Sequence, residues 1–216
     1  MTTEVFVARE SDFQTVTDAW AVANSGSPKT ILLTAPYGGG KRALVAKLAR
    51  HAKSQEEDLL IFRPVFSEEE DGQNTLVKLY AGIMSFLHGN MTQRGKVELA
   101  LNSRKTQQTP RVQQWISSFL DGMKKGSPKP GETQFQLHIP SDNPLLGFVE
   151  LIHQMAQAYP VVLEIQNVHH THSVALVSMI KALLHKNATA ENTRLLTILS
   201  SVPMADNAGW ISQPLQ

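Results

Sequence analysis

Apolar residues recur along the chain at two spacings, one helical and one typical of short buried strands. Phe13, Val16, Trp20 and Val22 follow a capping-box sequence that starts at Ser11, and Gly26 closes the segment. This pattern predicts a helix over about 11–25. The remaining periodic segments predict strands at 29–34, 59–66, 161–165 and 195–199, and helices from 43 onward, at 74–87, at 143–158 and at 173–184.

Strands and helices alternate in this pattern, which is typical of a parallel sheet covered on both faces. We therefore predict an α/β three-layer sandwich with a mostly parallel sheet and helices on both sides. The chain has 216 residues, of which 42% are apolar, enough for one full core. We expect a single domain over residues 1–216.

The periodicity weakens between residues 88 and 142, where polar and basic residues dominate. We predict an insertion or surface arm here, with an amphipathic helix around 112–123 and a turn-rich run at 124–131. Trp115 and Phe119 lie four residues apart on that helix. The pattern favours packing of these two rings on the core, and a partner surface is the alternative. The arm also holds the basic cluster Arg104, Lys105, Arg111, Lys124, Lys125 and Lys129.

Charge and composition exclude several classes of protein. Lys and Arg number 20 against 19 Asp and Glu, so no basic field supports non-specific nucleic-acid binding. The chain has no cysteine and hence neither disulfides nor thiolate metal sites. No apolar run approaches the roughly 18 residues of a membrane span, and the N-terminus lacks a secretion signal. We expect a cytoplasmic location and no membrane partner.

The first predicted strand runs into a glycine-rich loop that leads into a helix. A phosphate-binding loop has the pattern G-x-x-x-x-G-K-S/T, in which backbone N–H groups and the lysine hold phosphates and the hydroxyl ligates magnesium. The eight positions here are Ala35 to Arg42, with Gly40 and Lys41 as the pattern requires. Arg42 stands in place of the hydroxyl. A plain glycine-rich turn before an exposed lysine is the alternative interpretation.

Two further segments give the chain a resemblance to the AAA and STAND group of P-loop ATPases, especially the origin-recognition-like subgroup. Residues 6–10, Phe-Val-Ala-Arg-Glu, are similar to that group's N-terminal motif F-V-G-R-E, with Ala8 in place of glycine. Residues 160–170 are similar to its Walker B segment, a hydrophobic strand that ends in two acids. The resemblance implies a P-loop NTPase-like fold, without the complete lid subdomain that this fold normally carries. It places the nucleotide at Val7, Pro36, Tyr37, Gly38, Gly39, Gly40, Lys41 and Arg42.

The chain departs from this family at the positions that serve magnesium and water. The resemblance puts the two Walker B acids at Gln166 and Asn167, which are amides and carry no charge. An amide can neither neutralise a hydrated magnesium ion nor act as a general base. With Arg42 replacing the hydroxyl, we expect no catalytic residue and no magnesium. Turnover should fall by about 10⁴-fold or more.

Binding of ATP or ADP without magnesium stays open at this point, because the loop backbone, the helix N-terminus and Lys41 remain. Arg42 could pair with a phosphate. Alternatively, the Arg42 guanidinium occupies the position where a phosphate would bind and pairs with Glu164 or an acid of the 68–71 run. In that case the loop binds no nucleotide and serves only as a scaffold.

Three weaker signals lie near the predicted carboxyl edge of the sheet. Ser200 and Ser201 end the fourth strand, where the family carries a polar residue that senses the γ-phosphate. His169, His170 and His172 could bind a transition metal, although a solvated loop is the favoured interpretation. The acidic run 68–71 is interpreted in the same way.

Our leading hypothesis is a catalytically degenerate AAA/STAND-like domain that serves as a protein-interaction, assembly or regulatory module, the N-terminal part of a longer bacterial protein. Its expected partners are proteins, including further copies of itself. A working nucleotide switch is the main alternative. A nucleic-acid-binding domain is disfavoured, because only the basic arm and the fold analogy support it.

Overall fold

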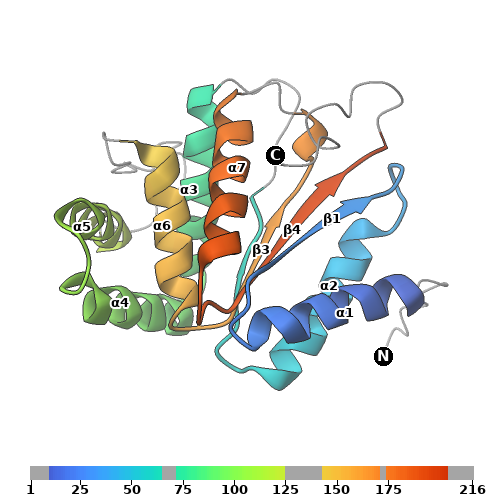
Figure 1. Ribbon diagram of the computed structural model, residues 1–216, viewed down its shortest axis with the longest axis horizontal. Helices are drawn as coiled ribbons and strands as arrows, with labels where there is room; N and C mark the ends of the chain where they lie inside the picture. Colours follow the sequence, from blue (N-terminus) through green and yellow to red (C-terminus); the bar gives the residue numbers. More distant parts are fainter. Residues whose placement is uncertain (1–9, 65–71, 125–142, 171–173, 204–216) are drawn as a thin grey trace.

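A computed structural model describes residues 10–64, 72–124, 143–170 and 174–203 of the chain (Figure 1). Four parallel strands form one sheet in the order β1-β4-β3-β2. They are β1 (Lys29–Thr34), β2 (Leu60–Phe62), β3 (Val161–Ile165) and β4 (Leu195–Ser201). The predicted α/β class with a parallel sheet is thus confirmed.

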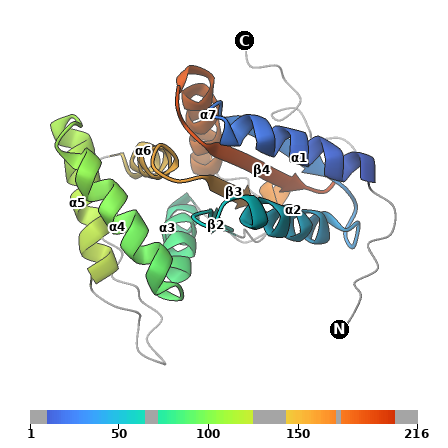
Figure 2. The same ribbon diagram turned by 90° about the horizontal axis from the view of Figure 1, so that it is seen from below.

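One face of the sheet is covered by α1 (Glu10–Asn24) and α2 (Lys41–Gln55), as Figure 2 shows. Trp20 of α1 and Leu48 of α2 are fully buried with Val162 and Ile198 of the central strands. Strand side chains alternate between faces, so Glu164 and Gln166 follow Val162 toward this same side. The face that holds α2 therefore also carries the polar end of β3.

The opposite face is covered by α3 (Gly72–His88), α6 (Pro144–Ala156) and α7 (Val174–Thr189) (Figure 1). Outside them lie α4 (Met91–Lys105) and α5 (Pro110–Lys124), which pack on α3 and α6. Trp115 and Phe119 are 2% and 4% exposed within this core. Their predicted packing on the core is confirmed.

Several boundaries and environments differ from the sequence predictions. The first strand was expected to be buried, but β1 is an outer strand of the described sheet and Leu32 is 43% exposed. Strand β2 ends at Phe62, four residues before the predicted end of the strand at residue 66. Helix α1 already contains Glu10, so Ser11 lies inside its first turn, and Val22 is exposed while Ala23 faces the core.

The predicted polar arm contains a helix that the hydrophobic pattern did not indicate. Helix α4 buries only Gln93, Val97, Ala100 and Leu101, too few apolar positions for the periodicity to stand out. The turn-rich run beyond Lys124 lies outside the described residues. No helix within the described ranges has the length and apolar character that crossing a bilayer requires.

Candidate functional site

The loop between β1 and α2 has a backbone that strongly favours glycine. Gly38 and Gly40 have φ angles of 74° and 76°, in the left-handed region that side chains disfavour. At Gly39 a Cβ atom would lie 2.8 Å from the carbonyl oxygen of Pro36 and 2.9 Å from the Cβ of Ala35. The Gly39 N–H donates to that same oxygen of Pro36 at 3.0 Å. Glycine is therefore favoured by backbone conformation at Gly38 and Gly40 and by the close approach of Pro36 at Gly39.

Helix α2 begins at this loop with its N-terminal N–H groups uncapped by a side chain. Its N-cap residue is Gly40, which offers no side-chain acceptor, and the first turn holds no acid. The partial positive charge of the helix end consequently faces the loop without a compensating carboxylate on α2. A glycine loop joined to such a terminus has the geometry that binds phosphate.

Lys41, and not Arg42, folds back over the loop. The Lys41 ammonium donates to the carbonyl oxygen of Ala35 and, at 3.2 Å, to that of Pro36. The Arg42 side chain is exposed. The alternative in which the Arg42 guanidinium closes the phosphate-binding position stays a hypothesis, because the acids at 68–71 that it names lie outside the described residues.

The carboxyl end of β3 carries the two amides at the positions predicted from the sequence. Gln166 is 8% exposed, and its backbone N–H donates to the carbonyl oxygen of Pro64 at 3.1 Å. Asn167 is half-buried with a φ of 58°, a left-handed conformation that asparagine tolerates better than most residues. The predicted sensor serines, Ser200 and Ser201, lie at the end of β4, the strand that pairs with β3. There the Ala35 N–H donates to the carbonyl oxygen of Ser201 at 3.3 Å.

Glu164 is the one acid that is buried within the described residues, and an arginine neutralises it. Its side chain is 2% exposed and lies 3.2 Å from the Nε of Arg63, just beyond β2. Burial raises the pKa of Glu164, while Arg63, a hydrogen bond with Gln166 and the charge of Arg42 each lower it. The predicted partner Arg42 therefore acts on Glu164 only through its field, and the ion pair belongs to Arg63.

The sequence analysis missed Arg63 because it placed this residue inside a longer second strand. The order of the sheet supplies the reason for the contact: β2 is the direct neighbour of β3, in register from Leu60 opposite Val161 to Phe62 opposite Leu163. Arg63 is the residue after Phe62 and therefore lies beside the end of β3. An arginine directly after one strand and a glutamate within the next was the available signal.

A histidine joins the loop to the end of β4. The backbone N–H of Val202 donates to Nδ1 of His169 at 3.3 Å, and Nε2 of His169 lies 3.1 Å from the hydroxyl of Tyr37. Since Nδ1 accepts, the tautomer assigned from these bonds carries its proton on Nε2 and donates it to Tyr37. His169, in the short 3-10 helix Val168–His170, thus holds the loop against the sheet's carboxyl edge.

The structure brings Tyr37, Gly38, Gly39, Gly40 and Lys41 together on one loop, with Gln166, Asn167 and Ser201 at adjoining strand ends. Val7 and the 68–71 run lie outside the described residues, as does His172. No group of three or more His, Asp or Glu side chains that could hold a metal ion occurs in the described part of the chain. The donor set does not fit magnesium, because amides and an arginine stand at all three positions and Glu164 is already paired.

Comparison with known proteins adds no assignment to this geometry. A scan against models of protein families finds no match, and a search of curated proteins finds no similar sequence. The loop, the strand ends and their charges are therefore the features that bear on function.

Proposed function

We propose that this chain is a catalytically inactive P-loop domain of the AAA/STAND type that acts as a protein-interaction, assembly or regulatory module. The observation that carries the proposal is the charge of the sheet's carboxyl edge. Gln166 and Asn167 stand where two carboxylates would be needed, and the nearby Glu164 is neutralised by Arg63 at 3.2 Å. A divalent cation would have no anionic ligand among these residues.

Loss of magnesium removes the main source of catalysis for phosphoryl transfer. That reaction relies on positioning and on neutralising charge in the transition state. The exposed Arg42 adds positive charge but supplies neither a metal ligand nor a base to orient water. We therefore expect no ATP hydrolysis above the uncatalysed rate.

A second candidate is binding of ATP or ADP without magnesium, and the shape of the loop favours it. The loop keeps φ angles of 74° and 76° at two glycines, and the terminus of α2 is uncapped. Lys41 would have to leave the carbonyls of Ala35 and Pro36 to reach a phosphate. The loss of these two hydrogen bonds opposes nucleotide binding. An inactive interaction module therefore remains the leading proposal.

A phosphate-release assay tests the loss of hydrolysis. Wild type is compared with Lys41→Ala and with the triple variant Arg42→Thr, Gln166→Asp, Asn167→Glu, which returns the hydroxyl and both carboxylates. We expect wild type and Lys41→Ala to release phosphate at the background rate. Magnesium-dependent release by wild type that disappears in Lys41→Ala would show that the chain is an ATPase.

A further inference from the structure

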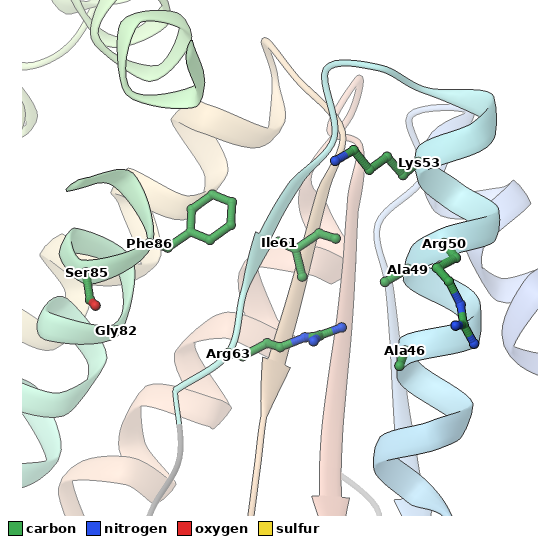
Figure 3. A pocket seen from close by; sticks show the side chains of 9 residues that line it. All are labelled: Ala46, Ala49, Arg50, Lys53, Ile61, Arg63, Gly82, Ser85 and Phe86. Carbon is green, nitrogen blue, oxygen red and sulfur yellow. The ribbon is translucent and has the colours of Figure 1, made fainter. Parts of the chain in front are cut away.

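A hollow of about 560 Å³ lies along the outer edge of β2, away from the glycine loop (Figure 3). Helix α2 forms one wall and α3 the other, and β2 runs between them. Ile61 supplies apolar surface at the strand, and Gly82 and Phe86 supply it on the α3 side. The hollow is therefore a groove in which the edge of a sheet is framed by two helices.

The backbone of β2 presents hydrogen-bonding groups to this groove. The Leu60 N–H donates to the carbonyl oxygen of Pro160 at 2.9 Å, next to β3, and the register pairs Phe62 with Leu163. Because successive residues of a strand direct their N–H and C=O groups to opposite sides, those of Ile61 point away from β3. No further strand pairs with β2 among the described residues. An extended chain could bond to Ile61 without breaking the sheet.

Positive charge is concentrated on the α2 side of the groove. Arg50 and Lys53 of α2 and Arg63 beyond β2 line it, and no described acid does. Lys53 is exposed, and Arg63 is 40% exposed although its Nε pairs with Glu164. In Figure 3 the Arg63 side chain extends from β2 toward α2. A strand laid in this groove would meet cations on one side and the ring of Phe86 on the other.

We propose that the β2 edge binds an extended acidic segment of a partner protein as an added strand. Side chains of such a strand alternate between its two faces. Acidic residues would face Lys53, whose side chain extends from α2 toward β2 in Figure 3, and the intervening apolar residues would face Phe86 on α3. Main-chain bonds give the affinity of strand addition and side-chain pockets give its specificity. This inference rests on the proposed role as an interaction module and names its surface and partner chemistry.

Fluorescence anisotropy with a labelled decapeptide of alternating Glu and Val tests the proposal on the full chain. The matched protein variants are Lys53→Glu in the groove and Lys181→Glu, an exposed helical lysine on α7. Two control peptides are matched to the alternating peptide. The first has the same composition with all Glu residues in one block and all Val residues in another, and the second has the alternating sequence with N-methylated backbone amides. We expect saturable binding of the alternating peptide, weakened about tenfold or more by Lys53→Glu and unchanged by Lys181→Glu. Both control peptides should bind about tenfold more weakly or worse.

Five results would overturn the proposal, four of them in the peptide assay and one in the oligomeric state. Those in the peptide assay are absence of saturable binding, equal affinity for Lys53→Glu, equal binding of the N-methylated peptide, or displacement of the peptide by inorganic phosphate, which would make the groove a small-anion site. Self-association of the chain that Lys53→Glu abolishes would assign the edge to a second copy and equally contradict it. Phosphate release does not involve this groove, so failure here is distinguishable from failure of the proposed inactive P-loop.

Discussion

Gly39 is the loop glycine at which an added Cβ atom would make the shortest contacts. The effect of these contacts on stability can be separated from the effect that replacing any glycine has on the backbone. A Cβ atom there would lie 2.8 Å from a backbone oxygen, which forces the loop to move. At Gly95 of α4 an added Cβ would meet nothing within 4 Å. The two positions make a matched pair for one substitution.

We predict that Gly39→Ala lowers the free energy of unfolding by about 1–3 kcal/mol, as overpacking against rigid atoms does. Gly95→Ala should raise it by about 0.5–1 kcal/mol, because alanine is favoured inside a helix. Urea unfolding of both variants beside wild type measures the two changes. Equal effects of the two substitutions would show that the loop does not need its close approach.

His153 on α6 is fully buried, and neither of its ring nitrogens has a hydrogen-bond partner among the described residues. Burial, together with the smaller effect of the Lys186 charge, lowers the pKa of His153 from 6.5 to about 4, and the side chain of Asn187 opposes the shift. The unfolded chain therefore takes up a proton at a higher pH than the folded protein. Stability from this group is present above pH 6.5 and is lost as the pH falls toward 4.

Between pH 7 and pH 4, wild type should lose up to about 3 kcal/mol of unfolding free energy relative to His153→Leu. The difference between the two proteins isolates His153, because Glu164, whose pKa is raised, titrates in both and changes stability in the opposite sense. Chemical unfolding across this pH range provides the measurement. Parallel profiles would contradict a buried neutral imidazole.

At the scale of elements, the sequence pattern predicted the four observed strands and most of the helices, and it missed helix α4, which buries few apolar residues. Strand β3 was predicted at its observed bounds, since all five of its residues are buried. Helix α4 was missed, because its polar surface includes long stretches such as Asn102 to Lys105. The exposure of β1 could not be predicted, because the position of a strand in a sheet depends on contacts distant in sequence.

Helix α5 is part of the core, and truncation of Trp115 to alanine tests this. Trp115 is 2% exposed, and its ring atoms lie 3.3–3.4 Å from a Cβ built at Gly147 of α6. Trp115→Ala should cost about 3–5 kcal/mol. Leu99→Ala, on the surface of α4 at 66% exposure, should change stability by no more than about 0.5 kcal/mol. A small effect of Trp115→Ala on thermal unfolding would restore the interpretation of this region as a detached surface arm.

Some features of the candidate site could be predicted from residues close together in the sequence, and others depend on contacts between distant residues. The glycine loop was predictable, because the strand, the glycines and the helix are consecutive in sequence. The resemblance to P-loop ATPases pointed to Gln166 and Asn167, and the predicted third strand placed them at a carboxyl end of the sheet. The Arg63 to Glu164 pair and the Tyr37 to His169 contact join residues 101 and 132 positions apart (164 − 63; 169 − 37). They depend on the order of the strands, which no local pattern gives.

At the scale of the whole molecule, two candidate surfaces lie at different edges of one α/β sheet. The carboxyl edge has the shape of a phosphate site but lacks its anionic ligands, while the β2 edge offers backbone groups and cations to a partner. Helix α2 contributes to both, with Lys41 at its start and Lys53 in its last turn. In the proposed function, the domain has no catalytic chemistry at the first surface and acts through the second.

Isothermal titration calorimetry with ATP, with and without Mg²⁺, tests the central claim most directly. Any heat of binding should be the same in both conditions, because amides and an arginine stand at the positions that would hold the ion. Micromolar binding that requires Mg²⁺ and is abolished by Lys41→Ala would contradict the account.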